Sequence, residues 1–176
     1  MKIFSKKKSS GFTFVETILT VVIITAISGV AAKVLLTGLD VYSLIVNRHD
    51  AIQTARLSME RMVDETLLVK TINILGLTNT RFSFRDIYNN STNFKTKTVT
   101  MDGQSVQCIY RDDDFLAGNV TFLDFDYMKA DGTSTILAWQ VKRVNIDINV
   151  EAPANAGTVH LRTEVFPRNF MYDNFE

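Results

Sequence analysis

An uncharged, mostly apolar run lies near the start of the chain. The sixteen residues between Glu16 and Lys33 carry no charge and are rich in Val, Ile, Leu, Ala and Thr. A helix needs roughly 20 such residues to cross a bilayer, so this run alone falls slightly short. If Lys33 extends its side chain to the membrane surface, Val34–Leu39 lengthens the apolar segment. We therefore expect residues 12–39 to be the transmembrane part of a long helix.

Beyond this segment the apolar positions follow a helical spacing. Two rows recur at steps of seven residues: Ile45, Ile52, Met59 and Thr66, and Ala55, Met62 and Val69. No proline interrupts the stretch, so the pattern predicts one helix from Phe12 to Lys70, with residues 40–72 as its soluble part. The rows are typical of a face that packs on a sheet. A coiled-coil seam between two chains is the alternative.

After Gly76 the period changes to two, which is typical of strands. Phe82 and Phe84 alternate with polar residues, and Tyr88–Asn93 is expected to be a polar loop. Asp102-Gly103 then separates two alternating runs, a strong hairpin signature. The runs contain Val99 and Met101 before the turn, and Val106, Cys108 and Tyr110 after it.

Three more segments alternate, and they complete the expected sheet. A second hairpin is predicted from Leu123–Tyr127, a turn at Ala130–Thr133 and a returning strand at Leu137–Val141. Val144–Val150 alternates without error, and after the loop Ala152–Gly157 the chain alternates again over Val159–Val165. Residues 73–176 therefore predict an antiparallel meander with one apolar face, which the helix covers. The expected fold class is α+β, with a long N-terminal membrane-spanning helix packed on an antiparallel β-sheet.

The residues before the apolar run are basic. Four lysines lie within the first eight residues: Lys2, Lys6, Lys7 and Lys8. The positive-inside rule places such an end in the cytoplasm, so the C-terminal region is expected on the other side of the membrane. A secretory signal peptide, cut after Ser28 or Ala32, is the alternative. Glu16 weighs against it, because an acid at the mouth of the apolar run has no use in a signal peptide.

The sequence Gly11, Phe12-Thr13-x-x-Glu16, followed by a long apolar helix, resembles the class III signal of type IV prepilins and type II secretion pseudopilins. The resemblance implies that a prepilin peptidase removes a leader, residues 1–11, by cutting between Gly11 and Phe12. The same enzyme would methylate the new amino group of Phe12. Glu16 would meet the amine of a neighbouring subunit during filament assembly. Ser9-Ser10 separates the last lysine from Gly11, a minor departure from the family pattern.

The C-terminal region is similar to a J-type minor pseudopilin and to related minor pilins. The similarity rests on the order of the expected strands and on the closing Val165-Phe166-Pro167-Arg168-Asn169. It implies a pilin-like subunit that initiates or caps a type II secretion pseudopilus or a type IV pilus. Its partners would be the prepilin peptidase, other minor and major pilins or pseudopilins, and the bacterial inner membrane. The C-terminal domain would be periplasmic. A binding module on the same anchor, either an adhesin or a DNA-uptake subunit, is the alternative.

The remaining chemistry is sparse, and we expect no enzyme activity, cofactor or metal site. His49 and His160 are too few for a zinc site or a catalytic triad. Asp112-Asp113-Asp114 lacks the spacing of a calcium loop and is expected to be a solvated turn. Cys108 is the only cysteine, so the two-cysteine loop of many major pilins is absent. Without the leader lysines the chain has 15 basic and 19 acidic residues, which argues against nucleic acid as a partner.

Overall fold

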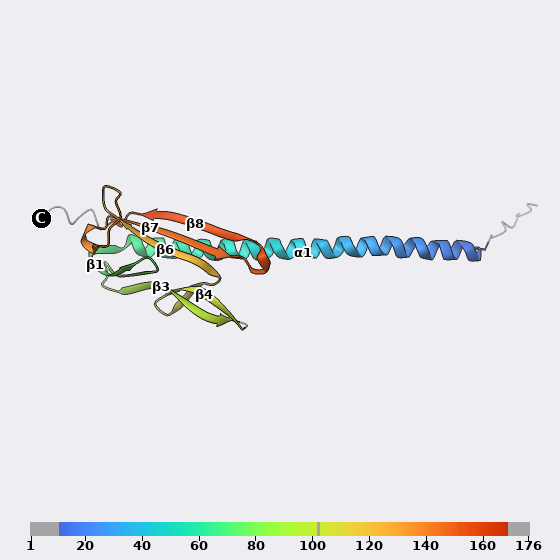
Figure 1. The fold of residues 1–176 in the computed structure, drawn as a ribbon, viewed down its shortest axis with the longest axis horizontal. Helices are drawn as coiled ribbons and strands as arrows, with labels where there is room; N and C mark the ends of the chain where they lie inside the picture. The colour runs from blue at the N-terminus through green and yellow to red at the C-terminus, as the bar shows by residue number, and fades with distance from the viewer. Residues whose placement is uncertain (1–10, 102, 169–176) are drawn as a thin grey trace, which may run out of the picture. The chain divides into compact units, whose positions relative to one another are not determined.

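The computed structural model describes residues 11–101 and 103–168 and divides the chain into two compact units. The first, up to Ser43, contains the N-terminal part of helix α1 (Phe14–Leu67). The second, from Leu44, contains the rest of α1 and strands β1 to β8 (Figure 1). The expected α+β fold is confirmed: a long apolar N-terminal helix is followed by antiparallel sheets, and its soluble half packs on them.

Helix α1 is slightly shorter than the sequence pattern predicts. It begins at Phe14 rather than Phe12, and it ends at Leu67 rather than Lys70. The early end has a physical reason, since Val69 is fully buried as the first residue of β1 and not as a helical residue. Leu68 closes the helix by donating its N–H to the Glu65 carbonyl at 3.1 Å. The seven-residue row Ala55, Met62 and Val69 thus continues from α1 into β1, although the helix has already ended.

Sheet A has five antiparallel strands in chain order, β1-β2-β3-β4-β5. Their bounds are β1 (Val69–Thr78), β2 (Arg81–Asp86), β3 (Ser91–Met101), β4 (Gln104–Arg111) and β5 (Asp114–Ala117). The expected hairpin around Gly103 is confirmed, with Met101 opposite Gln104. The expected loop Tyr88–Asn93 is wrong in its second half, because Ser91, Thr92 and Asn93 pair with β2. Their polar side chains suit a strand whose alternate face is partly wet.

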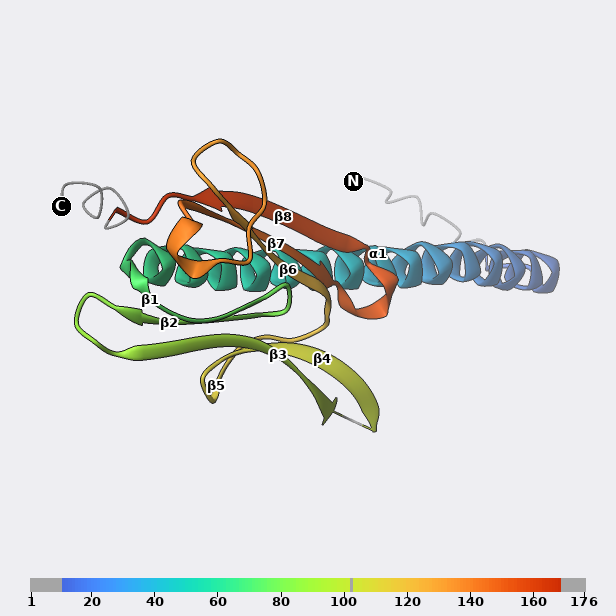
Figure 2. The ribbon, with the colours of Figure 1, turned by 60° about the vertical axis from the view of Figure 1, so that its left-hand side comes forward.

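Sheet B has three antiparallel strands, β6 (Val120–Met128), β7 (Arg143–Glu151) and β8 (Thr158–Val165). The expected second hairpin is wrong, because Leu137–Val141 does not return as a strand. Ala138–Gln140 form a short 3₁₀ turn, and β6 pairs with β7 instead. Trp139 is 68% exposed there, whereas the error-free alternation of β7 buries Val144, Ile146 and Ile148. The strands that the sequence predicts as one meander therefore form two sheets. Figure 2 shows the strands of the two sheets apart from each other.

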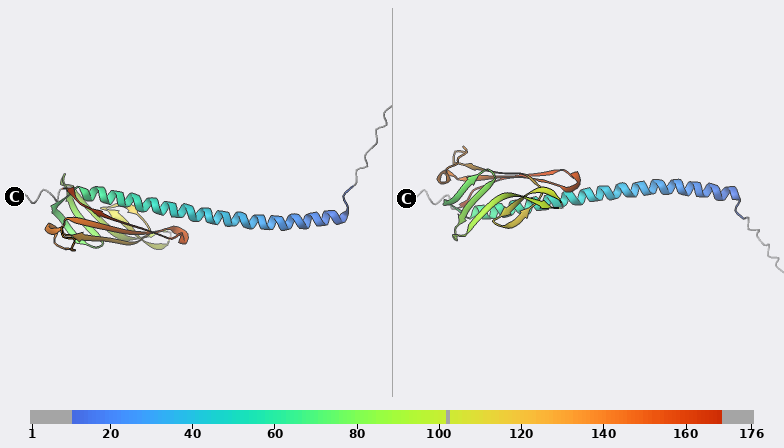
Figure 3. Two further views of the ribbon diagram at one scale, coloured as in Figure 1. Left: turned by 90° about the horizontal axis from the view of Figure 1, so that it is seen from above. Right: turned by 60° about the horizontal axis from the view of Figure 1, so that its bottom comes forward.

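The core lies between the second half of α1 and the two sheets (Figure 3). On α1 the buried residues are Ala51, Ala55, Ser58, Met59, Met62 and Thr66. This confirms the predicted stripe, although Ile45 is exposed. The sheets contribute an aromatic cluster in which the Phe82 ring centroid lies 4.8 Å from Phe84 and 5.7 Å from Phe125. Phe125 comes from sheet B, so these rings join the two sheets.

Candidate membrane anchor and processing site

The start of α1 is fixed by a local hydrogen-bonded cap. The Thr13 hydroxyl accepts the backbone N–H of Glu16 at 3.3 Å, and the Thr13 carbonyl accepts the N–H of Thr17 at 3.2 Å. Thr-x-x-Glu is the pattern of a capping box, in which the N-cap hydroxyl satisfies an otherwise unpaired donor of the first turn. The motif that resembles a prepilin signal therefore also determines where the helix begins.

Glu16 lies exposed in this first turn. A carboxylate near the N-terminus of a helix is stabilised by the positive end of the helix dipole. No other described residue forms an ion pair with it. The four leader lysines and Ser9-Ser10 lie outside the described residues. Glu16 is thus a helix-stabilising acid within its own chain, and its carboxylate remains open to a partner.

Gly11 and Phe12 precede the helix in an exposed segment without regular secondary structure. The Phe12 side chain is 78% exposed, and nothing lies within 4 Å of a Cβ placed at Gly11. A peptidase needs a peptide bond that is free of secondary structure and open to its active site. The bond between these two residues meets both conditions.

The apolar part of α1 has no partner within the described chain. Every residue from Phe14 to Ser43 is exposed. The segment between Glu16 and Lys33 is long and apolar enough, with its flank, for α1 to cross a membrane. Exposing so much apolar surface to water is unfavourable, at about 25 cal/mol per Å². An apolar environment around the segment would remove that cost.

The threonines of this segment do not oppose a membrane environment. Each of four hydroxyls donates to the carbonyl four residues earlier, so its hydrogen bond is made within the helix. The pairs are Thr17 with Thr13, Thr20 with Glu16, Thr25 with Val21 and Thr37 with Lys33. An unpaired hydroxyl in hydrocarbon would cost several kcal/mol, roughly 4–8 on the cyclohexane scale. These threonines avoid that cost.

At the other end of α1, an ion-pair network holds the helix to sheet A. Arg111 Nε on β4 lies 2.7 and 2.8 Å from the two oxygens of Glu65, whose side chain is only 14% exposed. Arg61 reaches the same carboxylate from one helical turn away. The hydrogen bond to Glu65 raises the pKa of Arg111, because it stabilises the charged guanidinium. The sequence offered no sign of this pair, since its members are 46 residues apart.

The three aspartates Asp112–Asp114 that follow β4 each form an ion pair with a basic side chain. Asp112 and Asp114 lie 3.6 and 3.9 Å from Arg111 Nη1, and Asp113 lies 3.5 Å from Lys95 Nζ. Asp112 and Asp113 form the turn between β4 and β5, as the sequence predicts, and Asp114 is the first residue of β5. Within residues 11–101 and 103–168 no cluster of three or more His, Cys, Asp or Glu side chains is arranged to hold a metal ion.

The other candidate chemical groups have ordinary surroundings. His49 bonds Gln53 on the surface of α1, and His160 bonds Asp147 across β7 and β8 at 2.6 Å. Cys108 is buried, and burial raises the pKa of its thiol. A buried thiol with a raised pKa is a poor nucleophile.

Comparison of the chain with protein-family models, curated proteins and solved structures found no match to any of them. Sequence reasoning identified Gly11, Phe12 and Glu16 but missed the capping role of Thr13. The Thr-x-x-Glu spacing was a sufficient signal for that role.

Proposed function

We propose that this chain is a minor pilin or pseudopilin, a structural subunit that initiates or caps a type II secretion pseudopilus or a type IV pilus. One observation carries the proposal: an apolar helix, exposed on every side up to Ser43, begins at Phe14 with Glu16 in its capped first turn, just after the exposed, non-helical Gly11-Phe12 bond. A membrane anchor alone would explain the apolar surface. It would not explain an acid at the helix start beside an accessible processing site.

In this proposal the anchor holds the subunit in the inner membrane until the filament takes it up. The prepilin peptidase cuts before Phe12 and methylates its new amine. That amine is then positive and four residues from Glu16, at the edge of a low-dielectric layer. Pairing Glu16 with the amine of a neighbouring subunit neutralises two charges that are costly in such a layer. The partners are other minor and major subunits.

The first test is the intact mass and N-terminal sequence of the protein recovered from membranes of its own host. We expect a chain that starts at Phe12 and is heavier by one methyl group than the bare sequence. A chain that starts after Ser28 or Ala32 would contradict the proposal, because Glu16 would then be lost with a signal peptide.

The second test separates the two roles of Glu16. Glu16→Gln keeps a side chain that suits a capping box but removes the charge. We expect normal processing and greatly reduced incorporation into filaments, measured by immunoblotting sheared filaments against membranes. Thr13→Ser, which keeps the cap and the charge, is the matched control. Normal incorporation of Glu16→Gln would show that the charge has no part in assembly.

The alternative of a DNA-uptake subunit gains no support from sheet B. The β7 residues that alternate with its buried apolar side chains are Asn145, which is itself buried, Asp147, Asn149 and Glu151. DNA binding requires a surface with a net positive charge. This face of β7 is neutral to acidic after Arg143.

A further inference from the structure

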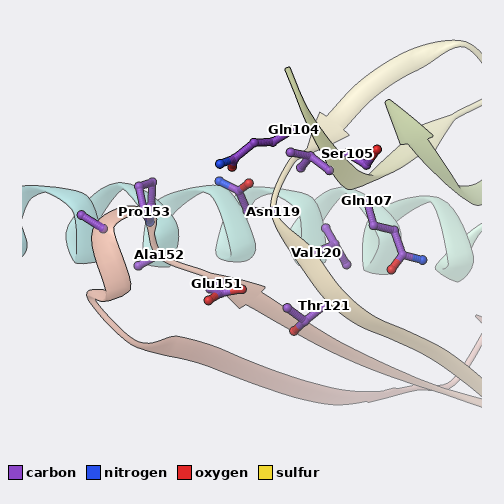
Figure 4. Close-up of a pocket in the computed structure, with 11 residues that line it drawn as sticks. Gln104, Ser105, Gln107, Asn119, Val120, Thr121, Glu151, Ala152 and Pro153 are labelled. Atoms are coloured by element: carbon purple, nitrogen blue, oxygen red, sulfur yellow. The ribbon is translucent and has the colours of Figure 1, made fainter. Parts of the chain in front are cut away.

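A polar groove lies between the two sheets, at the end of the β3–β4 hairpin (Figure 4). Its volume is about 680 Å³, within the range of roughly 300–1,000 Å³ that is usual for ligand sites. Three segments line it: Gln104–Gln107 on β4, Asn119–Thr121 at the start of β6, and Glu151–Ala154 after β7. All three belong to the second compact unit.

One wall of the groove is an open strand edge. β5 pairs with β4 only at Ile109–Arg111, so the preceding part of β4 pairs with β3 alone. In an antiparallel ladder, successive residues direct their N–H and C=O groups to opposite sides. Met101 and Gln104 close a two-residue hairpin, so Gln104 is directed toward β3. Ser105 and Gln107 are therefore directed to the open side, and no described backbone group pairs with them there.

The opposite wall presents a similar edge. Phe125 donates its backbone N–H to the Asn79 carbonyl, on the side away from β7. Glu151 on β7 donates its N–H to the Asn119 carbonyl, on the β6 side. These two bonds show which residues of β6 and β7 direct their main-chain groups toward the partner strand. By this alternation, and across the bulge between Val120 and Phe122, the main chain of Val120 is directed away from β7. The groove therefore lies between main-chain groups of β4 and β6. Such edges are templates for another strand.

The charge of the groove indicates what kind of strand it suits. Glu151 is the only charged side chain among the lining residues, and it is exposed. It forms no ion pair with any residue in 11–101 or 103–168. A lysine or arginine on an incoming segment would pair with it. The lining also contains no aromatic side chain on which a sugar ring could stack.

We infer that the groove binds an extended, basic polypeptide segment of a partner protein, which adds as a strand to the open edge of β4. Main-chain hydrogen bonds to Ser105 and Gln107 hold the segment, and its basic side chain pairs with Glu151. The inference rests on the proposed function in one respect: the partner is a component of the same membrane-bound assembly.

The test measures hydrogen exchange at the Ser105 amide by mass spectrometry. The full chain is compared in its host membranes and after extraction as a detergent-solubilised monomer. We expect exchange to be about tenfold slower in the membranes, because the amide is hydrogen-bonded to the partner only there. Equal exchange in both samples would overturn the inference.

Two substitutions at one position separate main-chain from side-chain recognition. Gln107→Pro removes an N–H that makes no bond within the chain, so the hairpin is expected to keep its ladder to β3. It should abolish the protection of Ser105. Gln107→Ala removes the side chain, keeps the N–H, and should retain the protection. The opposite result, protection lost in Gln107→Ala and kept in Gln107→Pro, would overturn the inference in favour of a side-chain-bound ligand such as a glycan.

Glu151→Lys tests the charge, and we expect it to abolish the protection of Ser105. Unchanged protection would overturn the assignment of a basic segment. Unchanged exchange at β7 amides serves as the folding control for every variant. The N-terminal mass from the same membranes tests the proposed function separately. A chain processed at Phe12 with an unprotected β4 would overturn the groove inference alone.

Discussion

The two parts of α1 belong to one helix but have different surroundings. From Phe14 to Ser43 every residue is exposed, although most are apolar. From Leu44 onward the helix is amphipathic, with a buried stripe that includes Ala55 and Met62 and a polar face that includes Arg56 and Glu60. One continuous helix therefore has two parts that are suited to different environments. The first part is suited to lipid on all sides, and the second to a protein core on one side and water on the other.

The largest effect is expected from separating these two parts. A chain of residues 44–176 should remain in solution without detergent and unfold cooperatively in urea, because the second unit contains the whole described core. The full chain should partition completely into membranes or detergent. Both are measured by ultracentrifugation and circular dichroism. Aggregation of the 44–176 chain would show that its fold depends on the first part of α1.

The next largest effect should distinguish the two faces of the second part. Met62 is fully buried, and Met62→Ala is expected to lower the free energy of unfolding by about 2–5 kcal/mol, since it leaves a cavity. Leu57 is 65% exposed on the same helix, so Leu57→Ala should change the free energy of unfolding by no more than about 0.5 kcal/mol. Urea denaturation of the 44–176 chain measures both. Similar losses for the two variants would refute the assignment of faces.

A smaller effect is expected where the end of α1 is joined to sheet A. Arg111→Met leaves the mostly buried Glu65 with Arg61 alone, which should cost about 1–2 kcal/mol of unfolding free energy. Lys95→Met is the control, because the Asp113 side chain of that pair is fully exposed, and it should cost less than about 1 kcal/mol.

A double-mutant cycle with Glu65→Gln tests whether Glu65 and Arg111 act together. The double variant should lose less stability than the two single variants combined, because neither then leaves an unpaired charge. Additive losses would show that the close approach of the two side chains contributes no coupling energy.

How far the sequence predicts this molecule depends on the range of the interactions involved. The buried stripe of α1, the hairpin at Gly103 and the strand Val144–Val150 follow from local periodicity, and the structure confirms them. The return of Leu137–Val141 as a strand was wrong, because alternation cannot tell which strand will pair with β6. The division into two sheets is likewise set by long-range pairing that one sequence does not encode locally.

The residues of the candidate site can be named from the sequence alone, whereas those of the network at Arg111 cannot. Gly11, Phe12 and Glu16 lie within six residues of one another, so a linear motif contains them all. The Glu65–Arg111 pair depends on the packing of α1 against β4, and the groove depends on how far β5 extends along β4. Both become visible only when strand pairing is known.

The smallest effect is expected at the start of the first part, where Thr13 caps the helix. Thr13→Ala removes the acceptor for the Glu16 N–H, and loss of such a cap costs about 1 kcal/mol locally. Local opening should become about fivefold more frequent, and the Glu16 amide should exchange faster by that factor in detergent micelles. Thr13→Ser should restore slow exchange, while the unfolding of the second unit stays unchanged in both variants. If Thr13→Ala leaves exchange at Glu16 unaltered, the cap does not determine where α1 begins, and Glu16 would then be positioned by the apolar run that follows it.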